Sequence, residues 1–377
     1  MHKIDPNLVK EVDALSCFNK NIECLICSNN YNLTKKSLKN FDFIEFPFIN
    51  AFGLTLNKDN IYFLAKFHHI DYITSEAKVY SQINIAKKVA NIDKLTLQGY
   101  TGSGITVVVI DTGIYPHIDF LLPKNKIIYF KDFVNNKNFA YDDNGHGTFI
   151  AGVIAGSGRI NKKYTGVAKN VNLISLKALD NKGETGAFTI LQAMQWVYDN
   201  KQKYNIKVVC MSFGANPLQN NDPLLKGAEK LWNSGITVVA AAGNSGPSEK
   251  TIKSPGISSK IITVGALDDK RNDLEETYEK NFAVADFSSR GPAFNYFKPD
   301  LIASGVEIKG LKNDKNLFTK MSGTSVATPI VAGVCCLLLE KYPKLSPNQI
   351  KYLLLNHCKP LTKNKNLEGY GIINADL

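Results

Sequence analysis

The strongest constraint on the fold of this chain is the alternation of short apolar segments with helical ones between residues 105 and 264. Short, nearly continuous apolar strands separated by helices predict a parallel β-sheet with helices on both faces, an α/β fold. Function gathers at the carboxyl ends of the strands in such a sheet, so the functional residues are expected there. The predicted strands are 105–110, 171–176, 208–211, 237–241 and 261–264, and the predicted helices are 147–155, 185–200 and 223–234.

The first part of the chain has a different pattern, which predicts a small α+β domain over residues 1–82 ahead of an α/β domain over residues 83–377. Two domains suit a length of 377 residues, because single hydrophobic cores rarely grow beyond about 300 residues. In the small domain the pattern predicts strands at 21–28 and 70–82, two strands within 41–56 separated by a break at 51–53, and helices at 33–39 and 58–69.

Charge and cysteine content narrow the classes of partner. The net charge of +11 comes from 45 Lys and Arg against 34 Asp and Glu, and the lysines are spread along the chain. A solvated surface is therefore expected, with no nucleic-acid partner. Cys24 and Cys27 form a lone Cys-x-x-Cys with no second pair, which argues against metal binding. Neither a secretory signal pattern nor a membrane-length apolar run is present, so we expect a cytoplasmic protein with no membrane partner.

Three residues suited to nucleophilic catalysis lie at predicted strand ends or helix starts. Asp111 ends the first strand, His146 opens the next helix between two glycines, and Ser325 opens the apolar helix near the C-terminus. A helix start favours developing negative charge because its backbone N–H groups are unpaired. Singly, each residue has an ordinary structural explanation as a cap or a turn residue. An aspartate, a histidine and a serine in this order on one sheet are much less expected by chance than any one of them alone.

The segments around these residues resemble the signatures of the subtilisin-like serine peptidases. Asp-Thr-Gly at 111–113, His-Gly-Thr at 146–148 and Gly-Thr-Ser-Val-Ala-Thr-Pro at 323–329 match the three catalytic motifs of that family in its chain order. The resemblance spans about residues 83–360 and is closest to the intracellular branch, since no signal peptide is seen. Further matches are Met-Ser-Phe-Gly at 211–214, Ala-Ala-Ala-Gly-Asn-Ser-Gly at 240–246, Phe-Ser-Ser-Arg-Gly-Pro at 287–292 and Lys-Pro-Asp-Leu-Ile-Ala at 298–303.

The resemblance implies a serine endopeptidase that works through an acyl-enzyme and needs no organic cofactor. Ser325 would be the nucleophile, His146 the general base, and Asp111 the residue that orients the imidazole. Asn244 matches the family's oxyanion residue. Protein or peptide substrates would be the partners. The substrate-binding positions that the resemblance implies are Gly183, Ser212, Phe213, Gly214, Ala241, Gly243 and Lys253.

Lys253 departs from the family, which usually has a small residue at the floor of the primary specificity pocket. A lysine there would either shorten the pocket or offer a positive charge to an acidic P1 side chain. Alternatively, Lys253 directs its ammonium outward to solvent. A second departure is the loop 156–165, which is basic and has no carboxylate. It does not resemble the calcium-binding loop of secreted subtilisins, so no metal is expected there, although Asp119 and Asp300 could serve elsewhere.

The N-terminal domain resembles the propeptides of this family, which assist folding and whose last strand occupies the cleft until it is cut. The resemblance implies a zymogen that processes itself near Gln82. Alternatively, residues 1–82 remain attached as a regulatory cap. Two other classes are alternatives for the chain: a catalytically silent homologue that binds peptides as a scaffold or regulator, and a nucleotide-binding α/β protein. The latter is disfavoured because Asp-Thr-Gly at 111–113 stands where a Gly-x-Gly-x-x-Gly turn would be needed.

Overall fold

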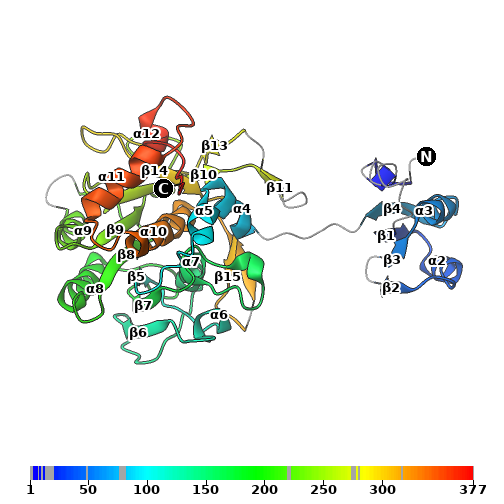
Figure 1. Cartoon of the computed structure of the whole chain (residues 1–377), viewed down its shortest axis with the longest axis horizontal. Helices are drawn as coiled ribbons and strands as arrows, with labels where there is room; N and C mark the ends of the chain where they lie inside the picture. The colour runs from blue at the N-terminus through cyan, green and yellow to red at the C-terminus, as the bar shows by residue number, and fades with distance from the viewer. Residues whose placement is uncertain are drawn as a thin grey trace. The chain divides into compact units, whose positions relative to one another are not determined.

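A computed structural model of the chain contains two compact units, Met1–Val79 and Tyr80–Leu377 (Figure 1). The division falls among residues 76–81, which lie outside the described residues, and α4 (Gln82–Val89) belongs to the second unit. The described residues are 3–6, 8–9, 12, 21–47, 50–75, 82–218, 222–272, 277–278, 281–315 and 317–376.

Within its described residues, the first unit is a four-stranded antiparallel sheet accompanied by the helices α2 and α3, as expected for a small α+β domain. Its strand order is β2-β3-β1-β4, and β1 pairs with both β3 and β4. Asn30 and Asn57 cap the two helices by accepting hydrogen bonds from their first turns. The elements are β1 (Ile22–Ser28), α2 (Tyr31–Ser37), β2 (Phe43–Phe46), β3 (Ala51–Leu56), α3 (Lys58–Leu64) and β4 (Ile70–Ser75).

Three predicted boundaries in this unit were wrong. The helix predicted at 58–69 ends earlier, because α3 stops at Leu64. The break at 51–53 does not exist, because β3 begins at Ala51 and Phe52 packs in the core opposite Ile26. Burial of Phe52 outweighs the tendency of Gly53 to interrupt a strand. The strand predicted at 70–82 ends at Ser75 in the described residues, and Gln82 already begins α4.

The second unit is built on an eight-stranded sheet of order β13-β10-β9-β8-β5-β7-β6, with β14 beside β10. Every pairing is parallel except that of β13. The five predicted strands are confirmed, whereas β6, β13 and β14 were not predicted. The strands are β5 (Thr106–Asp111), β6 (Ile127–Asp132), β7 (Asn172–Lys177), β8 (Ile206–Met211), β9 (Thr237–Ala241), β10 (Ile262–Asp268), β13 (Ala283–Val284) and β14 (Leu301–Ser304).

Helices cover this sheet, and the three predicted helices are present as α7, α8 and α9. Helix α7 packs against α10, and α8 packs against α9. The helices of this unit after α4 are α5 (Ile92–Leu97), α6 (Ile118–Leu121), α7 (His146–Ala155), α8 (Ala187–Asn200), α9 (Pro223–Asn233), α10 (Thr324–Lys341), α11 (Pro347–His357) and α12 (Lys365–Glu368), with a 3-10 turn η2 (Lys162–Tyr164). Two small hairpins pair β11 (Arg271–Asn272) with β12 (Thr277–Tyr278), and β15 (Ile308–Leu311) with β16 (Phe318–Met321).

Helix α10 is the central helix of the core. It contacts β8, β9, β10 and β14, and its residues from 326 to 339 are all buried. Within the described residues it is the one helix long and apolar enough to cross a membrane, but 83% of its apolar window is buried inside the protein. Its apolar character is therefore explained by packing on the sheet.

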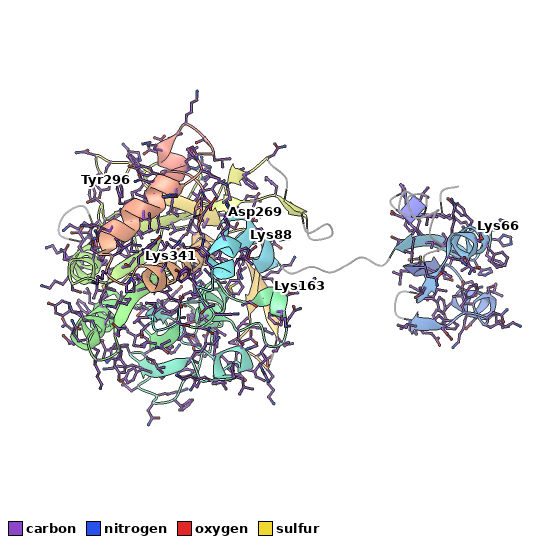
Figure 2. The ribbon with its side chains drawn as sticks, viewed as in Figure 1. Lys66, Lys88, Lys163, Asp269, Tyr296 and Lys341 are labelled. Atoms are coloured by element: carbon purple, nitrogen blue, oxygen red, sulfur yellow. The ribbon has the colours of Figure 1, made fainter. Side chains whose placement is uncertain are left out.

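Lysine side chains are distributed over both units. In Figure 2, Lys66 lies beyond α3 in the first unit, while Lys88, Lys163 and Lys341 lie on α4, η2 and the end of α10 in the second. These four lysines come from separate elements of the two units.

Candidate active site

The carboxyl end of β5 holds an aspartate and histidine in direct contact. Asp111 is the last residue of β5 and is buried, and His146 is the first residue of α7. Asp111 Oδ1 lies 2.7 Å from His146 Nδ1 and also accepts a hydrogen bond of 2.8 Å from the backbone N–H of Thr112. The closeness of α7 to β5 requires Gly147, since a Cβ there would lie 2.1 Å from the carbonyl oxygen of Gly113.

The environment shifts the pKa of His146. Burial lowers the pKa of the imidazole, but the charge of Asp111, its hydrogen bond and the charge of Asp142 offset this, so the pKa of His146 is raised above its ordinary value. Hydrogen bonding of Nδ1 to Asp111 leaves Nε2 as the ring nitrogen available for a second partner.

Ser325 and Asn244 meet beside Gly323. Ser325 is the second residue of α10, which Gly323 precedes. A Cβ on Gly323 would lie 2.9 Å from Ser325 Oγ and 3.2 Å from Asn244 Nδ2, so a side chain there would crowd both groups. Thr324 fixes Asn244, because its backbone N–H and its hydroxyl each donate to Asn244 Oδ1 at 2.9 Å. With Oδ1 held in this way, Nδ2 is the end of the amide that lies beside Gly323.

Ser212 connects the sheet to the start of α10. It follows β8, the neighbour of β5, and its hydroxyl donates to the carbonyl oxygen of Ser325 at 2.9 Å. Asp111 at the end of β5 holds His146, and α7, which His146 opens, packs on α10. The structure thus gathers the predicted aspartate, histidine and serine at the carboxyl edge of neighbouring strands.

Residues 212–216 form a segment next to Lys253 that runs from the buried Ser212 to an exposed edge at 214–216. Phe213 is half-buried and Gly214 is exposed. The edge is anchored by two backbone hydrogen bonds of 2.9 Å between Ala215 and Ser254. Ala241 ends β9 and is buried, and Gly243 follows two residues later.

The aliphatic part of Lys253 lies between two glycines. A Cβ on Gly214 would be 2.6 Å from Lys253 Cβ, and a Cβ on Gly243 would be 2.4 Å from Lys253 Cγ. Lys253 Nζ donates to Asn216 Oδ1 at 2.6 Å. The methylene groups therefore occupy the space between the glycines, while the ammonium is held by a side chain of the exposed edge.

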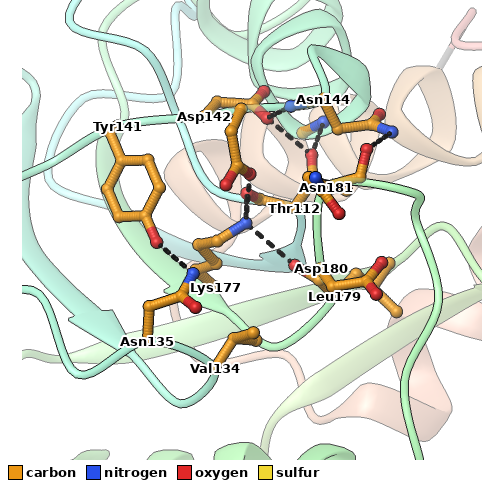
Figure 3. A network of polar contacts seen from close by, with 12 residues as sticks. Thr112, Val134, Asn135, Tyr141, Asp142, Asn144, Lys177, Leu179, Asp180 and Asn181 are labelled. Atoms are coloured by element: carbon orange, nitrogen blue, oxygen red, sulfur yellow. Dashed lines mark hydrogen bonds and ion pairs between the residues drawn. The ribbon is translucent and has the colours of Figure 1, made fainter.

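Gly183 lies in the turn that follows β7, which is the neighbour of β5 on the side opposite β8. The turn is closed by a 2.9 Å hydrogen bond from the backbone N–H of Asp180 to the carbonyl of Glu184, and Gly183 adopts a φ of +79° that favours glycine. Asn144, two residues before His146, donates from its side chain to the carbonyl of Asn181 at 3.1 Å. The Gly183 turn is thereby tied to the segment that carries His146 (Figure 3).

Three polar residues of this site were not identified from the sequence: Thr112, Asp142 and Lys177. Lys177 is fully buried at the end of β7, beside Asp111, and donates to Asp143 Oδ1 at 2.6 Å and to the carbonyls of Thr112 and Leu179. In the sequence, the signal for Lys177 is a lysine at the end of an apolar strand. An ammonium buried there needs hydrogen-bond acceptors such as these around it.

The loop 156–165 is held without a cluster of carboxylates. Asp119 accepts backbone N–H groups from Gly158 at 2.8 Å and Ile160 at 3.4 Å. Lys126 is buried, and its Nζ donates to the carbonyls of Ala155 at 2.7 Å and Asp119 at 3.2 Å. A positive charge from the chain thus already faces these oxygens, and the group does not suit a calcium ion. Asp300, the other candidate cation ligand, is paired with Lys298 and Lys351.

Known proteins resemble this chain across most of its length. Residues 102–372 match the model of the subtilase family, Peptidase S8. The chain is 39% identical to the serine protease AprX of Bacillus subtilis, over 81% of this chain and 73% of that protein. It is 34% identical to subtilisin DY of Bacillus licheniformis, over 75% of this chain and 94% of that protein. Among solved structures, sphericase aligns with a TM-score of 0.65 at 28% identity, over 79% of this chain and 99% of the other.

Proposed function

This chain belongs to the subtilase family and is a subtilisin-like serine endopeptidase, and we propose that Asp111, His146 and Ser325 are its catalytic triad. The observation that carries the proposal is the 2.7 Å contact between Asp111 Oδ1 and His146 Nδ1, with Ser325 at the start of the helix that packs on α7. A buried carboxylate against Nδ1 fixes the tautomer in which Nε2 can accept a proton.

In this mechanism Ser325 Oγ attacks the carbonyl carbon of the scissile peptide bond while His146 Nε2 takes the hydroxyl proton. The imidazolium that forms is stabilised by Asp111, in keeping with the raised pKa of His146. When the C–N bond breaks, His146 gives the proton to the leaving amine and the acyl group stays on Ser325. Water then attacks the ester with His146 as the base, which releases the acid and restores the serine.

Asn244 is proposed as an oxyanion donor. Its Oδ1 is held by Thr324, which directs Nδ2 toward the space beside Gly323 and Ser325. A preorganised N–H donor stabilises the tetrahedral oxygen without reorganisation during the reaction. The backbone N–H of Ser325 at the start of α10 would be the second donor.

The substrate would bind as an extended strand along the segment at residues 212–214, with the Gly183 turn as the opposite wall. Backbone pairing of this kind tolerates varied sequences, which suits a peptidase acting on proteins and peptides. Ala241 and Gly243 would border the primary pocket. Because the Lys253 stem lies between Gly214 and Gly243, we propose that it narrows this pocket and disfavours large P1 side chains.

The N-terminal unit would act as a propeptide, with the chain cut near Gln82. It is compact and has its own core, and the division from the second unit falls among residues 76–81, just before Gln82. A parallel sheet with many long-range pairings folds slowly, which gives a folding assistant a physical use. We propose that this unit also occupies the cleft until it is removed.

We further propose a cytoplasmic location and independence from calcium at the loop 156–165. The cysteines of the described residues are free thiols, as in proteins of reducing compartments. At the loop, Lys126 supplies a positive charge to the carbonyls of Asp119 and Ala155. Cell fractionation with activity-based labelling would test the location.

Replacing the nucleophile and the oxyanion donor should have unequal effects. Ser325→Ala should lower turnover by about 10⁶ and abolish labelling by a fluorophosphonate. Asn244→Ala should lower turnover by about 10²–10³ and retain slow labelling. Peptide hydrolysis and labelling of purified folded variants are the measurements. A wild-type protein that neither cleaves peptides nor labels would instead support a silent peptide-binding homologue.

Removing the Lys253 side chain should widen P1 preference. Lys253→Gly should raise kcat/KM for Leu and Phe P1 peptides by about tenfold or more relative to Ala P1, because the space between the two glycines opens. Lys250→Ala, which alters a nearby exposed lysine, is the control and should leave the ranking unchanged. Comparison of Glu with Gln at P1 reports any role of the charge. An unaltered P1 ranking in Lys253→Gly would contradict the narrowed pocket.

Self-processing should depend on the nucleophile. Mass spectrometry of the wild type should show loss of an N-terminal fragment ending within a few residues of Gln82, whereas Ser325→Ala should keep its full mass because no acyl-enzyme can form. Adding a trace of active enzyme to Ser325→Ala shows whether the cut can be made in trans. An active wild type that keeps residues 1–82 would indicate a permanent regulatory cap.

Calcium removal should leave stability nearly unchanged, whereas removal of Lys126 should not. Thermal unfolding should occur at the same temperature in EDTA and in calcium. Lys126→Met should lower the free energy of unfolding by about 1–3 kcal/mol, since the carbonyl of Ala155 loses the ammonium donor and that of Asp119 keeps only the backbone N–H of Ser157. Lys124→Met, in the same segment but exposed, is the matched control. A large stabilisation by calcium would overturn the assignment.

A further inference from the structure

Asp142 is a second buried carboxylate next to the Asp111–His146 pair. It is 6% exposed and lies four residues before His146, where its backbone bridges to Gly113. The side-chain amide of Asn313 donates to its carbonyl oxygen at 3.0 Å. The residue is therefore fixed from the β5 side and from the segment between β15 and β16.

The carboxylate of Asp142 joins the two segments that carry the aspartate and the histidine. Its Oδ1 accepts hydrogen bonds from the Thr112 hydroxyl at 2.9 Å and from the backbone N–H groups of Gly145 at 2.8 Å and Asn144 at 3.1 Å. Its Oδ2 accepts from the backbone N–H of Thr148 at 2.9 Å and from the hydroxyl of the same residue at 2.6 Å. Figure 3 shows Asp142 beside Thr112 and Asn144.

Thr112 is held between two carboxylates. Its backbone N–H donates to Asp111 Oδ1 at 2.8 Å, and its hydroxyl donates to Asp142 and accepts from the N–H of Gly147 at 2.9 Å. A displacement of Asp142 would therefore move both the residue that follows Asp111 and the residue that follows His146.

The contacts require an ionised acid at position 142. All five groups that reach its oxygens are donors, and only a carboxylate presents acceptor sites on both oxygens. An asparagine of the same shape would turn an NH2 group toward one set of these donors. The hydrogen bonds lost would be those of Thr148 in the first turn of α7, or those of the turn that precedes His146.

We propose that Asp142 is a positioning residue for the peptidase reaction, holding Thr112 and the start of α7 so that Asp111 and His146 keep their contact. The inference rests on the proposed catalytic roles of those two residues. Asp142 does not need to touch the substrate for this role.

The charges around His146 predict that Asp142 also affects the pH dependence of the activity. His146 contacts Asp111 from β5 and is influenced by the charge of Asp142 from the preceding turn, while Asp143 in the same turn is paired with Lys177 from β7. Burial lowers the pKa of His146, and the charges of Asp111 and Asp142 together with the Asp111 hydrogen bond raise it. Neutralising Asp142 should therefore lower the pKa of His146 and extend activity to more acidic pH.

The test compares Asp142→Asn with Asp132→Asn. Asp132 is a matched control because it is also buried and accepts three backbone N–H groups, but it contacts neither Thr112 nor His146 through any of its hydrogen bonds. Asp142→Asn should lower kcat by about 10–100-fold, with KM changed little, and should move the acid limb of kcat/KM to lower pH. Asp132→Asn should lower stability and leave that limb in place.

An activity-independent readout is the NMR titration of His146 in the Ser325→Ala background, where its pKa should fall when Asp142→Asn is added. This titration still reports on Asp142 if the wild type proves inactive, so failure of the proposed function is distinguishable from failure of this inference. Unchanged kcat and unchanged titration in Asp142→Asn, or equal changes in Asp132→Asn, would overturn the role.

If Asp142→Asn does not fold, Thr112 provides the second test. Thr112→Val removes the hydroxyl that joins Asp142 to Gly147 but keeps the shape, and should lower kcat while KM stays close to the wild-type value. Thr112→Ser keeps the hydroxyl and should retain most of the turnover. Equal turnover of the two variants would contradict the proposed link.

Discussion

Parallel pairing of β5 with two neighbours is the interaction on which the rest of the second unit depends. β5 pairs with β7 on one side and β8 on the other, and the three strands end at the same edge. The chain passes from β5 to β6 on the β7 side of the sheet, whereas from β7 it crosses to β8 on the other side of β5. Such a reversal is where α/β sheets place their functional groups. Asp111, Lys177 and Ser212 come to this edge because each ends or follows one of the three strands.

Close backbone approach then brings two helices to this edge. Gly147 allows α7 to meet the Gly113 carbonyl, and Gly323 leaves room for Ser325 and Asn244. Burial makes the polar contacts here consequential, because an unpaired group in a low-dielectric interior costs more than one in water. Asp142 and Lys177 meet this requirement by filling their donor and acceptor positions with backbone groups and neighbouring side chains.

Much of the fold was predictable because its periodicity is local. The five central strands are short apolar runs whose burial follows directly from their composition, and α7, α8 and α9 began within two residues of their predicted starts. Elements with weaker patterns were missed or misplaced. β6 opens on the apolar residues 127–130 but is only partly buried, unlike the other central strands, and it was not predicted. At Ala51 and Phe52, packing against β1 decided the conformation although Gly53 suggested a break.

By itself the sequence determined the α/β class, the family signatures and the identity of Asp111, His146, Asn244 and Ser325 as candidates, because motif residues are adjacent in the chain. Contacts between distant segments were decided only by the tertiary structure. The stem of Lys253 lies between Gly214 and Gly243, and Lys126 faces the carbonyls of Asp119 and Ala155. Asp142 likewise joins Thr112 to the start of α7. A lysine or aspartate reads the same in sequence whether it lies in solvent or in a core, since its partners are chosen by the packing of strands and helices far apart in the chain.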